Sequence, residues 1–156
     1  MQLLIDEQFL LVASELIQKA KRNVFISTYK AEISPKPRGR RLRSLFDLLV
    51  LKARLGLDVR LYLNKLGDNW WVPRSNFTAV NALRSSKIQI RTPSGGRNCH
   101  AKIILIDNIV AIVGSHNLSI TSCHRNFEVS CGVVDLNAVD LLYSTYEKVW
   151  SEGKKG

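Results

Sequence analysis

The feature that most constrains the fold is a pair of apolar runs in the second half of the chain. Residues 103–106 and 109–113 are apolar without interruption, and Asp107 and Asn108 separate them. Both separating residues tolerate a positive φ, so the runs predict two strands joined by a two-residue hairpin. Strands that are apolar on both faces are typical of the interior of a sheet that is covered on each side. The segment therefore predicts a central hairpin between two layers of helices.

The remainder of the chain alternates between helical and strand patterns. Apolar residues recur at helical spacing in residues 6–21, 42–53, 75–86 and 137–150. Strand patterns occupy residues 24–26, 57–63, 87–91 and 127–134. This order favours βαβ units, so we expect an α/β fold with a mixed, largely parallel β-sheet flanked by helices on both faces. No convincing boundary divides the 156 residues, and residues 1–156 predict a single domain.

The charge balance indicates a polyanionic partner. Lys and Arg number 23 against 13 Asp and Glu, which gives a net charge of +10. An excess of this size favours nucleic acid first and an anionic membrane surface second, although plain solubility is the alternative. The basic segment contributes Lys36, Arg38, Arg40 and Arg41, broken by prolines and a glycine. We expect it to be a surface loop that either tracks phosphates or is simply solvated.

Cysteine usage and the N-terminus predict a cytoplasmic protein. Cys99, Cys123 and Cys131 form no paired pattern, which is typical of a reducing compartment. We expect no signal peptide, because residues 1–7 lack both a basic region and a long apolar region. We expect no integral membrane association, because no apolar stretch reaches about 18 residues without a charge. Cys99-His100 and Cys123-His124 match no zinc-ligand spacing, so no metal or other cofactor is expected.

The chemistry-bearing residues gather around the predicted hairpin. They are His100, Lys102, Asp107, Gly114, Ser115, Asn117 and, after Asn126-Phe127, Glu128. Residues two apart on a strand share a face, so His100 and Lys102 place an acid–base or nucleophilic group beside a fixed cation. That pairing suits a phosphodiester. Asp107 also fits ordinary hairpin-turn chemistry, and we expect a mainly structural role within the motif.

The other members of the run have simpler alternatives too. Gly114 predicts a close backbone approach at a strand end, or merely a turn. Ser115 and Asn117 are candidates for binding a phosphate group, but they could also be turn residues. Glu128 could lie on a solvated face. We favour a site role because the apolar residues of its strand occupy the opposite face.

The spacing His100-x-Lys102-x4-Asp107-x6-Gly114-Ser115-x-Asn117 resembles the HKD motif of the phospholipase D superfamily. That family has an αβα sandwich fold, and many of its members carry two such motifs where this chain has one. Small single-motif members, including a bacterial endonuclease of similar length, form homodimers with one active site on the two-fold axis. The resemblance therefore implies a homodimer, since one histidine cannot both attack phosphorus and protonate the leaving oxygen.

The resemblance also implies a metal-independent mechanism. His100 of one copy would attack phosphorus to give a phosphohistidine, and His100 of the other would protonate the leaving group. Lys102 and Asn117 would hold the non-bridging oxygens, and Ser115 would donate a hydrogen bond in the same pocket. Glu128, which sits where the family places a supporting glutamate, would orient His100 and favour its protonated form.

Three functions remain open at this point. The first is a homodimeric nuclease of low sequence specificity acting on DNA or RNA, which is compatible with a helicase or recognition partner in trans. The second is a phospholipid phosphodiesterase that uses the same residues. The third is a basic nucleic-acid-binding subunit without turnover, which the intact motif disfavours. Trp70 and Trp71 could stack on bases, sit at a bilayer interface, or pack in a loop or dimer contact.

Overall fold

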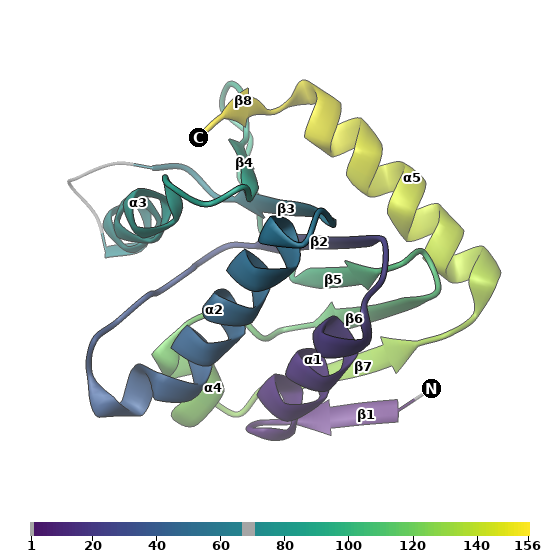
Figure 1. Ribbon diagram of the computed structural model, residues 1–156, viewed down its shortest axis with the longest axis horizontal. Helices are drawn as coiled ribbons and strands as arrows, with labels where there is room; N and C mark the ends of the chain where they lie inside the picture. The colour runs from purple at the N-terminus through teal and green to yellow at the C-terminus, as the bar shows by residue number, and fades with distance from the viewer. Residues whose placement is uncertain (1, 67–70) are drawn as a thin grey trace.

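A mixed eight-stranded sheet runs through the part of the chain that the computed structural model describes, residues 2–66 and 71–156, with residues 71–73 given by their backbone alone. The strand order is β1-β7-β6-β5-β2-β3-β4-β8 (Figure 1). The strands are β1 Gln2–Ile5, β2 Asn23–Thr28, β3 Asp58–Leu63, β4 Gln89–Thr92, β5 Ile103–Ile106, β6 Val110–Gly114, β7 Val129–Val133 and β8 Lys154–Lys155. The predicted hairpin is confirmed as β5 and β6, which lie inside the sheet. Its turn residues Asp107 and Asn108 have φ values of 54° and 57°.

Helices cover both faces of the sheet, as predicted, and form two separate cores. On one face lie α1 Gln8–Lys19, α2 Arg40–Arg54 and α3 Trp71–Leu83. On the other lies α5 Leu136–Glu152, which buries Val139, Tyr146 and Trp150 against the sheet. The rings of Tyr146 and Trp150 of α5 form a stack with Phe25 of β2, with neighbouring centroids 5.2 and 5.9 Å apart. This aromatic packing holds the helix against the sheet.

The sheet is mixed, but its parallel part is smaller than expected. Within the described residues, two strand pairings are parallel and five are antiparallel. The parallel pairs β2–β3 and β3–β4 are the ones whose strands are joined through helices α2 and α3. After β4 the chain returns as the antiparallel series β5, β6 and β7. The three-residue link between β5 and β6 is too short for a crossover, whereas β6 and β7 are antiparallel although residues 115–128 join them.

Four elements escaped the sequence analysis, and each is short. They are β1, β8, the five-residue helix α4 Ile120–His124 and the 3₁₀ turn η1 Pro37–Gly39. None is long enough to show a period. The basic segment is therefore not a plain loop, because it comprises η1 and the first turn of α2, which contains Arg40 and Arg41. Trp70 lies outside the described residues, and the backbone of Trp71 begins α3 instead of continuing a loop. Among the described helices, none combines the length and hydrophobicity that crossing a bilayer requires.

Candidate active site

The antiparallel order of β5, β6 and β7 gathers most of the motif at one edge of the sheet. His100 and Lys102 immediately precede β5, Ser115 and Asn117 follow β6, and Glu128 immediately precedes β7. The end of β2 reaches the same edge, because Ser27 of β2 pairs with Ile103 of β5. These four strand ends are 11 to 101 residues apart in the sequence. Only the sheet brings them together.

His100 and Lys102 form the centre of this edge. The Lys102 ammonium lies 3.0 Å from Nδ1 of His100 and donates to the His100 carbonyl oxygen at 2.7 Å. The Tyr29 ring packs beside them, with its centroid 4.9 Å from that of the imidazole. Burial lowers the pKa of Lys102, while the negative charge of Glu128 opposes that shift. His100 itself is exposed, so a substrate can reach its ring.

Asn117 is held by the end of β2. Its side-chain oxygen accepts hydrogen bonds from the backbone N–H of Lys30 at 3.1 Å and from the Thr28 hydroxyl at 3.3 Å. When the oxygen of a side-chain amide accepts from two donors, its NH₂ group points away from those donors. The arrangement therefore fixes the orientation of a side-chain donor close to the edge.

Glu128 is buried and acts on Asn117 rather than on His100. It accepts from the Ser122 hydroxyl at 2.9 Å and from the Asn126 amide at 3.0 Å. The Ser122 hydroxyl in turn accepts from the backbone N–H of Asn117 at 2.8 Å. Burial raises the pKa of Glu128, but hydrogen bonds from neighbouring side chains, among them Asn126 and Ser122, outweigh it, so the net pKa shift is downward and favours the carboxylate.

The role expected for Glu128, orienting His100, stays a prediction. Among the described residues, no hydrogen bond joins Glu128 to His100, so the chain does not show the predicted direct orientation of the imidazole. The reason is local: α4 folds back between Asn117 and β7, and its Ser122 takes the carboxylate.

Ser115 and Gly114 join β6 tightly to β7. The Ser115 hydroxyl accepts from the Val129 N–H at 3.1 Å and lies 3.3 Å from the Val129 carbonyl oxygen, to which it donates. A β-carbon on Gly114 would collide with Ser130, so only glycine allows this separation. The close backbone approach expected at this position is thus an approach to β7.

Asp107 is the motif member that the structure does not bring to this edge. It lies in the hairpin turn at the opposite end of β5. Its carboxylate accepts from the backbone N–H groups of Lys21, Arg22 and Asn23 at 2.8, 2.7 and 3.0 Å. Burial raises the pKa of Asp107, but these hydrogen bonds and the charge of Arg22 outweigh it, and the net pKa shift is downward. Asp107 therefore anchors the start of β2 to the hairpin.

Sequence reasoning missed two buried polar residues that support the site. His116, inside the motif, stacks on Phe9 with centroids 4.4 Å apart, and its nitrogens bond the Ser130 hydroxyl at 2.7 Å and the Asp6 carbonyl at 3.1 Å. Asn64, at the end of β3, accepts from the backbone N–H of Cys99 at 3.0 Å and so fixes the residue before His100. The position of Asn64 directly after an apolar strand was the only available signal.

The basic segment lies beside α4, on the same side of the molecule as the site (Figure 1). The backbone N–H of Glu32, four residues before the segment begins, donates to the carbonyl oxygen of Leu118 at 2.8 Å and so fastens the preceding chain just after Asn117. Arg38 lines a surface hollow of about 340 Å³ together with His124 and Arg125 of the α4 region. Lys36, Arg38, Arg40 and Arg41 are all exposed, and Arg41 forms an ion pair with Glu7 at 2.8 Å.

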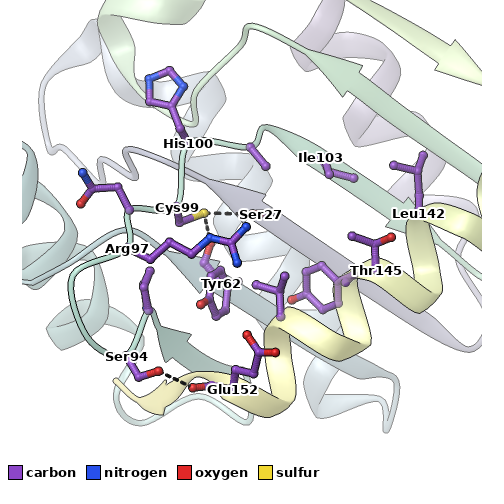
Figure 2. Close-up of a pocket in the computed structure, with 15 residues that line it drawn as sticks. Ser27, Tyr62, Ser94, Arg97, Cys99, His100, Ile103, Leu142, Thr145 and Glu152 are labelled. Carbon is purple, nitrogen blue, oxygen red and sulfur yellow. Dashed lines mark hydrogen bonds between the residues drawn. The ribbon is translucent and has the colours of Figure 1, made fainter.

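A second hollow, of about 240 Å³, opens beside His100 on the α5 side of the sheet (Figure 2). Figure 2 shows His100 at its rim, with Leu142 and Thr145 of α5 along one wall. Cys99 lies in it, with its sulfur 3.1 Å from the Ser27 hydroxyl.

Burial raises the pKa of Cys99, and it raises the pKa of Cys123 to about 12, so both thiols are held in the neutral form. Among the described residues, no group of three His, Cys, Asp or Glu side chains is placed to bind a metal ion.

The sandwich fold together with the HKD spacing defines a protein of the phospholipase D superfamily. The chain belongs to the family described as "Cardiolipin synthase, PLD-like domain", which matches residues 13–150. It is 27% identical over 134 residues to the major cardiolipin synthase ClsA of Bacillus subtilis (strain 168), an alignment that covers 86% of this chain and 26% of that protein. The chain thus spans about a quarter of the length of the curated relatives it matches.

Two solved structures match almost end to end. Nuc, a phospholipase D family member from Salmonella typhimurium, superposes with a TM-score of 0.80 at 19% identity, covering 99% of this chain and 97% of Nuc. NucT from Helicobacter pylori superposes with a TM-score of 0.79 at 17% identity, covering 99% and 98%. At these identities the likeness shows that the fold is the same.

Proposed function

We propose that this protein is a metal-independent phosphodiesterase that cleaves nucleic acid through a phosphohistidine, at a site shared by two copies of the chain. The exposed imidazole of His100 attacks phosphorus, forming a P–N bond as the P–O bond to the leaving group breaks. His100 of the second copy gives its proton to the leaving oxygen and then takes one from the water that hydrolyses the P–N bond. Phosphate and alcohol ends are thereby released, and both histidines return to their starting states.

Lys102 and Asn117 bind the non-bridging oxygens of the phosphate. In the free site the Lys102 ammonium donates to Nδ1 of His100, which holds the ring in place. A bound phosphate would compete for that ammonium and release the ring for attack. Asn117 is held at two points: its side-chain oxygen by the end of β2, and its backbone N–H by Ser122, which Glu128 holds in turn. Donors that are fixed before the reaction stabilise the charge that develops in the transition state.

The observation that favours nucleic acid is the position of the positive charge. The protein carries +10 overall, and Arg38 and Arg125 line one hollow beside α4, the helix between Asn117 and Glu128. Arginines next to the cleavage site can follow the phosphates on either side of the scissile one. These contacts read no sequence, so low specificity is expected.

A second candidate is cleavage or transfer at a phospholipid phosphodiester. It is favoured by the family description and by the cardiolipin synthases among the relatives. His100 of both copies, Lys102 and Asn117 would act there in the same way, since the chemistry at phosphorus is the same. The two candidates differ in what surrounds the phosphate.

The test is incubation of purified protein in EDTA with labelled single- and double-stranded DNA and RNA, and in parallel with phosphatidylglycerol vesicles. We expect cleavage of nucleic acid, no lipid product, and no product from His100→Ala. Lipid product alone would establish the second candidate. Binding of nucleic acid without any cleavage would leave only the non-catalytic interpretation.

The basic hollow has its own matched control. Arg38→Ala/Arg125→Ala should weaken binding of nucleic acid roughly 10-fold or more at low salt and flatten its salt dependence. Arg54→Ala/Arg84→Ala removes the same charge from exposed positions at the end of α2 and just after α3, and should change binding only slightly. Equal effects of the two double variants would show that net charge alone, rather than this hollow, attracts the substrate.

A further inference from the structure

The hollow of about 240 Å³ beside His100 has no part in the chemistry at phosphorus described above. His100 and the residues on either side of it, Cys99 and Ala101, all belong to its lining. The hollow therefore opens directly beside the phosphorus that His100 attacks. A group attached to the scissile phosphate can enter it.

The walls of this hollow are mainly aliphatic. They are contributed by Pro93, Ile103, Leu142 and Val149. Leu141, which the sequence pattern groups with Leu142 and Val149, does not line the hollow and is 68% exposed. Tyr146 lines it too, but its ring is already stacked between two other aromatic rings under α5. The hollow thus offers aliphatic surface, and a flat ring that enters it gains van der Waals contacts on its faces.

Three polar side chains interrupt this apolar lining. Tyr62 is only 5% exposed, and among the residues that the structure describes its hydroxyl has no hydrogen-bond partner. Figure 2 shows Arg97, from the loop before His100, and Glu152, from α5, on different walls with Tyr62 between them. Burial raises the pKa of Tyr62; the charge of Glu152 adds to this rise and that of Arg97 opposes it, so both charges act on the hydroxyl. A cationic donor, an anionic acceptor and a hydroxyl that can do either therefore converge on one hollow.

We infer that this hollow receives a nucleobase next to the phosphate that is cleaved. The inference rests on the proposed function, because it assigns the hollow to the nucleic-acid substrate of the same site. A nucleobase is a flat ring with two apolar faces, and its edge carries both hydrogen-bond donors and acceptors. The aliphatic walls match the faces, and Tyr62, Arg97 and Glu152 match the edge.

The polar groups favour a nucleobase over the acyl chain of a phospholipid. An acyl chain would cover the Tyr62 hydroxyl without offering it a hydrogen bond, and a covered hydroxyl without a partner is costly. It would also place methylene groups against the charges of Arg97 and Glu152. All bases have apolar faces, so the aliphatic walls accept each of them, in agreement with the low sequence specificity of the proposed function.

The first experiment compares the cleavage of two small substrates in EDTA. One is the thymidine dinucleotide, and the other has the same sugars and phosphate but lacks both bases. For wild type, kcat/KM should be roughly 10-fold or more higher for the intact dinucleotide, because the abasic compound leaves the hollow unfilled. Equal values for the two substrates would overturn the inference while leaving the proposed function in place.

Two adjacent residues of α5 provide a matched pair of variants. Thr145 lines the hollow and Ser144 does not. Both are exposed, and both hydroxyls donate to the carbonyl oxygen of Leu141. Thr145→Trp fills the hollow and should bring the ratio of the two kcat/KM values close to one, whereas Ser144→Trp should keep the wild-type ratio. A wild-type ratio in Thr145→Trp would overturn the inference.

The hydroxyl of Tyr62 has a matched control as well. Tyr62→Phe keeps the ring and should lower the same ratio several-fold, because the edge of the base loses one partner. Tyr143→Phe removes a hydroxyl from a tyrosine of α5 that does not line the hollow, and should keep the wild-type ratio. Equal ratios in the two variants would remove Tyr62 from the proposed site.

A second measurement needs no turnover. In His100→Ala with isotope-labelled methyl groups, the intact dinucleotide should shift the NMR signals of Leu142 and Val149, which line the hollow. At the same concentration the abasic compound should shift them several-fold less. Dihexanoyl-phosphatidylglycerol, added in parallel, should leave them in place.

The NMR outcomes separate this inference from the proposed function. If the lipid shifts the two signals and the dinucleotide does not, or if neither does, the hollow is not a base site and the inference is wrong. If the dinucleotide shifts them but the wild type cleaves no nucleic acid, the proposed function is refuted and the base site remains.

Discussion

The two ends of the β5–β6 hairpin carry residues of one motif but differ in how their polar groups are used. At the turn, the Asp107 carboxylate accepts from three backbone N–H groups, so its hydrogen bonds stabilise the fold. At the other end, His100 is exposed and contacts chiefly Lys102 and Tyr29. Groups already satisfied inside the fold contribute stability, and groups left facing solvent are available for chemistry. Substitutions at the two ends should therefore have opposite signatures.

The largest expected effect is at the solvent-facing end. His100→Ala should lower single-turnover cleavage roughly 10⁴-fold or more, because it removes the nucleophile and the general acid together. The free energy of unfolding in urea should change by less than about 0.5 kcal/mol, since the side chain is exposed. Acid-quenched wild type should contain an acid-labile phosphorylated peptide that spans His100. If the variant unfolded at a much lower urea concentration than wild type, His100 would contribute to stability as Asp107 does, which would contradict the difference between the two ends.

Lys102→Met comes next. It keeps the aliphatic stem but removes the cation that we assign to the phosphate oxygens, and cleavage should fall about 10²- to 10³-fold. Lys87→Met, at an exposed position just before β4, is the matched control and should cleave normally. Rapid quench under single-turnover conditions separates this loss from weaker binding. A change confined to binding would place Lys102 outside the chemical step.

Asp107→Asn should have the reverse signature. Asparagine tolerates the positive φ but offers a single acceptor oxygen, so we expect a loss of about 2–3 kcal/mol in the free energy of unfolding. Cleavage per folded molecule should stay within a few-fold of wild type. A large loss of cleavage in a stable protein would show that the turn end takes part in the chemistry.

The same variant has a pH signature. The pKa of Asp107 is lower in the folded protein than its unfolded value of about 3.9. Its contribution is therefore fully present above about pH 4 and is lost as the pH falls through the folded pKa. Urea titrations should show the gap between wild type and Asp107→Asn closing below about pH 4.

The smallest effect is expected at His116, which is buried at the solvent-facing end but has both nitrogens bonded. His116→Phe keeps the stack on Phe9 and leaves the Ser130 hydroxyl without its partner, at a cost of about 1–2 kcal/mol in unfolding free energy. Burial lowers the pKa of His116, while the Asp6 carbonyl and the charges of Glu128 and Asp6 oppose this shift. The stability that His116 contributes is thus present above its unfolded pKa of about 6.5 and declines as the pH falls below it. Urea unfolding at pH 7.5 and pH 5 should show a smaller difference at pH 5; a larger one would contradict this assignment.

Helices and strands that repeat an apolar pattern for several turns or pairs were predictable from the sequence. The hairpin at Asp107-Asn108, helices α1 and α2, and the alternation in β3 all have a period long enough to identify them. The HKD spacing likewise identified the superfamily, because its residues lie at fixed offsets within one short segment. These features depend on local geometry, which neighbouring residues determine among themselves.

Only the tertiary structure decided which polar groups meet. Nothing in the local sequence pairs Ser122 with Glu128, Asn64 with Cys99, or Asp107 with the start of β2, because those contacts follow from the strand order and from where α4 folds back. The burial of His116 against Phe9 and the exposure of Leu141 have the same origin. A sequence pattern records which face of an element is apolar. The packing of distant elements then determines whether that face is covered, and by what.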